Sequence, residues 1–362
     1  MTGTNVNRPG EPAYAGAGST FVKVPLVLAP EDLVGADVAI VGAPVDETVS
    51  FRPGARFGPR AIRQADAGGG PYRPNMDLGI NPFEVLSVVD YGDAEVVPAD
   101  QARSHDAIRK AVGEICGAGA IPIVLGGDHS IAHPDVGAVA AHLAPSQLGL
   151  VHFDAHADNA PSLFGVSMSH GTPMRRLVDD GSLRGDHIVQ VGLRGYWPDP
   201  EDFEWARSQG FRWHLMEEIS ERGMDAVMSD VVAEARAWDH LFISFDIDVC
   251  DPAFAPGTGT PEPGGITARE ALRAVRRLAW EVGFDGMEVV EVSPPYDHAE
   301  ITAFLANRLV LEALSGLALR RLGRTCGRAF AVSAVAFSPR ARRRTRRRLR
   351  RRFGCRPRRA GR

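Results

Sequence analysis

Three short segments of this chain concentrate side chains that bind metal ions. They contribute His129, Asp154, His156, Asp158, Asp246 and Asp248, and each segment follows an apolar run rich in β-branched residues. Oxygen and nitrogen ligands without a thiolate suit hard or borderline ions such as Mn²⁺ rather than a structural zinc. Four carboxylates also carry more negative charge than one divalent ion needs, so the pattern indicates two bridged metal ions.

The spacing within two of these segments is that of a β-strand, which places residues i, i+2 and i+4 on one face. If strand geometry continues past the apolar runs, Asp154, His156 and Asp158 point the same way, and so do Asp246 and Asp248. One such segment alone is more often a solvated loop or a buried histidine with ordinary partners, but three together favour a metal site. Two metal ions lower the pKa of a bridging water to near neutrality, so the expected reaction is hydrolysis.

Eight apolar runs predict the strands that must position these ligands. They lie at 37–42, 85–90, 120–125, 148–153, 187–192, 211–216, 241–246 and 286–292. The most apolar runs are continuous, as in strands buried on both faces of a parallel sheet. Helical patterns lie between many of them, including 103–117, 299–319 and 267–282, where Thr267 and Glu270 predict a capping box. This alternation predicts an α/β fold, a three-layer αβα sandwich with an eight-stranded, mostly parallel sheet.

Ligands of such sheets bind outside the carboxyl ends of the strands. The three ligand segments begin at those ends, so we expect them to converge on one edge of the sheet. Glu291 ends the last predicted strand and would reach the same edge, although an acid in that position can also simply face water.

The two ends of the chain differ from its middle. Residues 1–20 are rich in Gly, Pro and Ala and predict a flexible arm. The predicted catalytic domain covers 21–319, and 320–362 forms a tail with 18 arginines and no acidic residue. The tail is either a disordered extension, such as the product of out-of-frame translation, or an arm that binds nucleic acid or anionic membranes. We favour the extension and expect no nucleic-acid partner. The remaining chain is strongly acidic, which suits a cationic substrate.

Four widely spaced cysteines without a Cys-x-x-Cys pair fit a reducing compartment. The N-terminus lacks a signal pattern, and no apolar run approaches the roughly 18 residues of a membrane helix. We therefore expect a cytoplasmic protein without a membrane partner.

Four ordered motifs resemble those of the ureohydrolase family, which includes arginase, agmatinase and guanidinobutyrase. They are GGDHS (126–130), FDAHAD (153–158), SFDIDVCDPAFAPGTGTPEPGG (244–265) and EVSPPYD (291–297). The resemblance extends from about Val22 to Leu319 and excludes the arginine-rich tail. It implies an arginase-like fold, two Mn²⁺ ions per subunit and a homo-oligomer.

The resemblance also implies a role for each site residue. One ion is bound by His129, Asp154, Asp158 and Asp246, and the other by His156, Asp154, Asp246 and Asp248, so that Asp154 and Asp246 bridge. Asp158 manages the proton of the nucleophile, Glu291 pairs with the substrate guanidinium, and His170 carries protons to the leaving amine. Thr260 matches a threonine near the substrate, although it can also be an ordinary turn residue.

The substrate is predicted from departures from the arginase pattern. Arginases carry an asparagine where this chain has Ala160 and a serine where it has Val166. The side chains that hold the carboxylate and amine of an amino-acid substrate in arginases are therefore absent at these positions. HGTPMRR (170–176) and the segment 295–304 are closer to agmatinases. We therefore expect hydrolysis of agmatine to putrescine and urea. Guanidinobutyrase or another guanidino-acid hydrolase is the alternative, for which Arg56, Arg73 or Arg194 would hold the carboxylate, and arginase is a weaker one.

Overall fold

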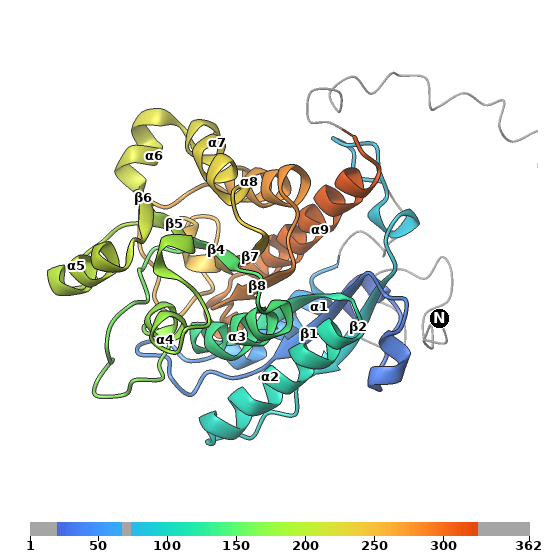
Figure 1. Ribbon diagram of the computed structural model, residues 1–362, viewed down its shortest axis with the longest axis horizontal. Coiled ribbons are helices and arrows are strands. Elements are labelled where there is room, and N and C mark those ends of the chain that lie inside the picture. The colour runs from blue at the N-terminus through green and yellow to red at the C-terminus, as the bar shows by residue number, and fades with distance from the viewer. Residues whose placement is uncertain (1–19, 67–73, 325–362) are drawn as a thin grey trace, which may run out of the picture.

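The computed structural model describes residues 20–66 and 74–324, and a sheet of eight strands forms its centre (Figure 1). The strand order is β2-β1-β3-β8-β7-β4-β5-β6, and every pairing between neighbours is parallel. The strands are β1 (Val38–Ala43), β2 (Val88–Asp93), β3 (Ile121–Gly126), β4 (Leu148–Phe153), β5 (Ile188–Leu193), β6 (Arg212–Leu215), β7 (His240–Asp246) and β8 (Gly286–Val290). Each of the eight apolar runs therefore overlaps one strand, and the predicted αβα sandwich is confirmed.

The helices cover both faces of this sheet (Figure 1). They are α1 (Gly58–Gln64), α2 (Gln101–Gly117), α3 (Ala132–Leu143), α4 (Pro173–Asp179), α5 (Pro200–Gln209), α6 (Met216–Arg222), α7 (Met224–Ala235), α8 (Ala268–Glu281) and α9 (Ile301–Arg321). One buried apolar cluster joins the sheet to α1, α6, α7, α8 and α9, and a second joins its other face to α2, α3, α4 and α5. The residues of the predicted N-terminal arm before Thr20, and those of the tail after Arg324, lie outside the described residues.

Helix α8 begins where its sequence predicts. The Thr267 hydroxyl oxygen accepts a hydrogen bond from the Glu270 backbone N–H, and the Glu270 carboxylate accepts one from the Thr267 N–H. This reciprocal pair satisfies two backbone donors that a helix start would otherwise leave unpaired.

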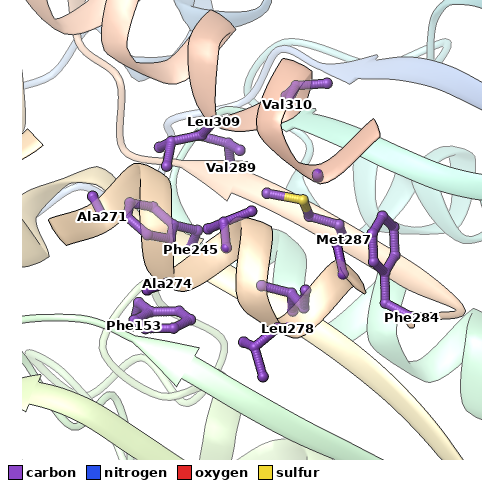
Figure 2. Packing of buried hydrophobic residues seen from close by; sticks show 14 of the residues in the cluster. Phe153, Phe245, Ala271, Ala274, Leu278, Phe284, Met287, Val289, Leu309 and Val310 are labelled. Atoms are coloured by element: carbon purple, nitrogen blue, oxygen red, sulfur yellow. The ribbon is translucent and has the colours of Figure 1, made fainter. Parts of the chain in front are cut away.

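Helices α8 and α9 pack closely on one face of the sheet. Leu278 of α8 and Leu309 of α9 lie with Phe245 of β7 in the apolar cluster between helices and strands (Figure 2). Gly316 permits this approach, because a Cβ atom there would lie 2.6 Å from the Ala279 Cβ and 2.8 Å from the Arg276 carbonyl oxygen. The glycine therefore serves helix packing.

Helix α9 corrects one expectation from the sequence. By length and composition alone it is long and apolar enough to span a membrane. Most of it is buried inside the protein, where it packs against α8 and α1, as the core helix of a globular protein does.

The strand order places the three ligand segments together. Strands β3, β8, β7 and β4 are consecutive neighbours in the middle of the sheet. Because all run parallel, the residues that follow Gly126, Val290, Asp246 and Phe153 emerge at the same edge.

Candidate metal centre

His129 lies at the centre of the site and is fully buried. It opens a short 3₁₀ turn after β3, and the preceding Asp128 caps this turn by accepting a hydrogen bond from the Ser130 N–H. Its Nδ1 atom lies 3.1 Å from Asp154 Oδ2, 2.9 Å from Asp158 Oδ2 and 3.3 Å from Asp246 Oδ2. Its Nε2 atom lies 2.9 Å from the Ser244 hydroxyl. The four residues predicted to bind the first ion therefore lie together around His129 Nδ1.

Three members of the second predicted ligand set, Asp154, His156 and Asp248, meet beside the first set. His156 Nδ1 lies 3.1 Å from Asp248 Oδ2 and 3.5 Å from Asp154 Oδ1. The two carboxylate oxygens of Asp154 thus face different imidazoles, as a carboxylate that bridges two ions must. Asp246 faces His129, and its Oδ1 accepts a hydrogen bond from the Asp248 N–H.

The explanation from strand spacing is wrong, although it selected the right residues. Strand β4 ends at Phe153, and Asp154–Asp158 is a loop in which Asp158 has a positive φ of 49°. Asp248 lies in the 3₁₀ turn Ile247–Val249 rather than on β7. Glu291 follows the end of β8 with a φ of 62°. The ligands converge because the chain turns at the ends of the strands and directs them toward one another. A strand that stayed extended would carry them away from the edge of the sheet.

The donor atoms fit divalent cations. The buried His129 Nδ1 makes no well-formed hydrogen bond, even though three carboxylate oxygens lie within 3.3 Å. Atoms at right angles around a cation with bonds of about 2.0–2.6 Å lie about 2.8–3.7 Å apart. The separations around His129 and His156 match that range. Oxygen and imidazole donors without a thiolate suit Mn²⁺ and related ions.

The electrostatics of the protein alone point the same way. Burial, together with the carboxylates of Asp248 and Asp154, raises the pKa of Asp246 well above its usual value. Burial opposes a charge on His129, but the nearby carboxylates of Asp154, Asp158 and their neighbours outweigh it and raise the pKa of the imidazole well above normal. Crowded carboxylates of this kind are stabilised by a nearby cation.

Glu291 and His170 form a buried pair at the edge of the ligand cluster. Glu291 Oε1 accepts a hydrogen bond from the His129 N–H at 2.9 Å and lies 3.2 Å from His170 Nδ1. Its Oε2 atom has no hydrogen-bond partner. A Cβ atom at Gly259 would lie 3.1 Å from Oε2, so the glycine leaves space in front of this oxygen. Burial raises the pKa of Glu291, partly offset by His170.

A pocket of about 200 Å³ opens onto the ligands. Its lining includes the predicted ligands His156, Asp158, Asp246 and Asp248, together with His170 and Thr260. The Thr260 hydroxyl donates a long hydrogen bond of 3.4 Å to Asp248 Oδ2. Every predicted site residue is therefore at or next to this pocket, while the roles assigned to them stay predictions.

Sequence reasoning missed several residues that line or support the pocket. Thr48 donates hydrogen bonds to Asp128 Oδ2 through its N–H and its hydroxyl, and its hydroxyl oxygen accepts one from the His170 N–H. Ser50 lies 2.9 Å from His170 Nε2 through its hydroxyl. The pocket is completed by the aromatic and aliphatic side chains Leu163, Phe164 and Trp197. These residues lie in irregular segments, so no periodic pattern indicates them.

The arginines considered as carboxylate binders are engaged elsewhere or outside the described residues. The Arg194 guanidinium donates to backbone carbonyls, including those of Asp248 and Glu262. Arg56 pairs with Asp46 and Glu47. Arg73 is not among the described residues.

Comparison with known proteins agrees with this geometry. The model of the Arginase family matches residues 36–316. A guanidinobutyrase from Pseudomonas aeruginosa is 40% identical over 305 residues, which cover 84% of this chain and 93% of the relative. A mitochondrial agmatinase from Gallus gallus is 42% identical over 282 residues, covering 77% and 81%.

Solved structures extend the similarity to the fold. The proclavaminate amidino hydrolase of Streptomyces clavuligerus superposes with a TM-score of 0.79 at 36% identity, covering 86% of this chain and all of that one. A family match over most of the chain, relatives at about 40% identity and the buried ligand cluster agree. This chain belongs to the arginase family of ureohydrolases.

Proposed function

We propose that this chain hydrolyses agmatine to putrescine and urea, with two Mn²⁺ ions held by His129, His156 and the four aspartates. The observation that carries the proposal is the arrangement around His129 Nδ1, where three buried carboxylate oxygens surround an imidazole nitrogen that makes no well-formed hydrogen bond. Two divalent ions, when bound, supply a hydroxide nucleophile at neutral pH.

Glu291 is suited to hold the substrate guanidinium. Its Oε1 is fixed by the His129 N–H and by His170, so the unpartnered Oε2 remains as an acceptor for a cationic N–H group. A hydrogen bond between two charged groups is about twice as strong as a neutral one, and burial strengthens it further.

His170 is suited to move a proton to the leaving amine. Burial disfavours its charged form, but the Glu291 carboxylate outweighs burial and raises the pKa of His170 to about 9. The ring therefore holds a proton at neutral pH. Its Nε2 atom lies 2.9 Å from the Ser50 hydroxyl oxygen, which can accept a hydrogen bond from the ring, and 3.2 Å from the Ser50 N–H, which can only donate one. When Nε2 carries a hydrogen, it can donate to the Ser50 hydroxyl oxygen. After it has given up that proton, it can accept a hydrogen bond from the Ser50 N–H, so Ser50 offers a partner in both states.

The pocket walls support agmatine as the substrate. Among the described residues that line the pocket there is no lysine or arginine to pair with a substrate carboxylate. Asn159, one position before the place where arginases carry their asparagine, is fully buried and donates to the Asp202 carbonyl instead of lining the pocket. These features favour a substrate tail without an amino-acid group or a carboxylate.

A second candidate is 4-guanidinobutanoate, since a guanidinobutyrase and a human guanidino acid hydrolase are each 40% identical to this chain. Urea release from agmatine, 4-guanidinobutanoate, 3-guanidinopropanoate and arginine in the presence of Mn²⁺ separates the candidates. We expect kcat/KM for agmatine to exceed the others at least tenfold. Faster turnover of a guanidino acid would reject the substrate but keep the reaction, whereas no urea from any compound would reject both.

We further propose that the enzyme acts in the cytoplasm as a homo-oligomer and binds no nucleic acid. The two cysteines within the described residues, Cys116 and Cys250, are both free, which suits a reducing compartment.

A further inference from the structure

A hydrogen-bonded chain behind the metal ligands runs from β5 to the bridging carboxylate of Asp154. His152 of β4 and Gln190 of β5 are register partners on these neighbouring strands, and both side chains are fully buried. Gln190 Nε2 lies 2.9 Å from His152 Nδ1, and His152 Nε2 lies 2.7 Å from Asp154 Oδ2. We infer that Gln190 is a positioning residue that fixes the orientation of the His152 ring and, through it, orients Asp154.

The contact with Ala157 fixes the orientation of the Gln190 amide. Its Nε2 atom lies 2.7 Å from the Ala157 carbonyl oxygen. A carbonyl can only accept a hydrogen bond, so the nitrogen of the amide, and not its oxygen, must face Ala157. The same nitrogen then has its second hydrogen for His152 Nδ1.

The Gln190 amide in turn fixes the proton on the imidazole. Because Gln190 donates to His152 Nδ1, that atom must hold a lone pair. The ring hydrogen that faces Asp154 then lies on Nε2, which donates it to Asp154 Oδ2. The two partners on opposite sides of the ring thus select one tautomer, as partners of histidines near metal ligands commonly do.

The His152 ring in turn orients Asp154. His152 takes one lone pair of Oδ2, and the His156 N–H takes one lone pair of Oδ1 at 2.7 Å. Each oxygen keeps a second lone pair. That of Oδ2 remains available on the side of His129, and that of Oδ1 on the side of His156. The carboxylate is therefore held in the orientation that bridging requires.

This inference rests on the proposed metal centre, so the experiment first counts Mn²⁺ bound by the wild type. Gln190→Met removes both donated hydrogen bonds at nearly constant volume. We expect it to weaken Mn²⁺ affinity about 10- to 100-fold, the usual effect of losing a partner of a metal ligand, as measured by competition with a chelating indicator. Asn307→Leu is the matched control, because Asn307 is a buried amide that donates to the Ile62 carbonyl away from the site. Its Mn²⁺ affinity should equal that of the wild type.

A double-mutant cycle tests whether Gln190 acts through His152. In a His152→Leu background, Gln190→Met should change Mn²⁺ affinity less than twofold, whereas His152→Gln, which keeps a neutral N–H donor, should restore most of the affinity. Independent, multiplying effects would show that Gln190 acts through the Ala157 loop and would overturn the inference. Wild-type affinity in Gln190→Met would overturn it as well. A wild type that binds fewer than two ions would instead reject the proposed metal centre.

Discussion

Replacement of Glu291 by glutamine isolates the charge that we assign to guanidinium binding. The side chain is 1% exposed, so a bound cation in contact with it would be shielded from water. Glutamine keeps the size of the residue and an oxygen that can accept from the His129 N–H. The position of Oε2, which has no partner in the protein, would then be occupied by an amide NH₂ group. That group would face the N–H donors of the guanidinium and could not accept from them.

The expected loss follows from this burial. Removing one partner of a buried, hydrogen-bonded charge pair costs about 2–5 kcal/mol. Since about 1.4 kcal/mol corresponds to a factor of ten, kcat/KM for agmatine should fall about 30- to 4,000-fold. The loss should appear mainly in KM if Glu291 binds the ground state and the transition state equally, and in kcat if the contact tightens in the transition state.

The assay is steady-state urea release at saturating Mn²⁺, with metal analysis of the same samples. Glu291→Gln should retain two ions per chain, because Glu291 contacts the backbone of His129 and none of its metal-binding atoms. Glu47→Gln provides the control, since it makes the same chemical change in an acid that pairs with Arg56. If Glu291→Gln kept kcat/KM within threefold of the wild type, Glu291 would have no part in binding the guanidinium.

Four further predictions follow from the metal site and the core. Asp246→Ala should lose metal and activity together because a bridging ligand disappears, and retention of two ions in metal analysis would contradict this. Mn²⁺ at 100 times its Kd should raise wild-type stability by about 2.7 kcal/mol for each site, or about 5.4 kcal/mol for two sites, in thermal unfolding, and the Asp246→Ala variant should show no such shift. Gly316→Ala should cost about 1–3 kcal/mol in urea unfolding because α9 must move away from α8, and an unchanged midpoint would reject the close packing. Burial lowers the pKa of His105 to about 4, so the unfolded chain, with a pKa near 6.5, binds the proton more readily. His105 should therefore reduce stability as the pH falls from about 6.5 to 4, by at most about 3 kcal/mol, and His105→Gln should flatten that dependence.

The sequence predicts the sheet well because its strands are buried on both faces. Runs such as 148–153 and 241–246 contain so little polar character that they can only lie inside the protein, and they correspond to β4 and β7. Asp154 directly follows the first of these strands, and Asp246 is the last residue of the second. The strand boundary at β2 is less accurate, since 85–90 was expected and Val88–Asp93 is observed. A 3₁₀ turn at Pro82–Glu84, capped by Asn81, delays its start.

The supporting residues are not predictable in the same way. Thr48 and Ser50 belong to a segment without helix or strand, and their relation to Asp128 and His170 exists only after distant parts of the chain meet. The role of Gln190 depends on its being opposite His152 in the β4–β5 register. A single sequence contains the residue types but not the pairing between strands, so hydrogen bonds across the sheet cannot be read from it.

The conformation of Asp158 and Glu291 explains why spacing selected the right ligands for the wrong reason. Both residues have positive φ, a region that costs a residue with a Cβ about 1–2 kcal/mol and that strand periodicity never predicts. Such a conformation persists only where the surroundings hold it. The Asp158 carbonyl accepts a hydrogen bond from the Met174 N–H of α4, and the Glu291 N–H donates to the Gly127 carbonyl. Each strained turn is thus held by a hydrogen bond to a neighbouring segment. The turn directs its carboxylate back toward His129, whereas an extended chain would carry that carboxylate past His129. The alternate spacing of the acids reflects these turns at the sheet edge, so a strand that truly continued through 154–158 would separate the ligands that the site brings together.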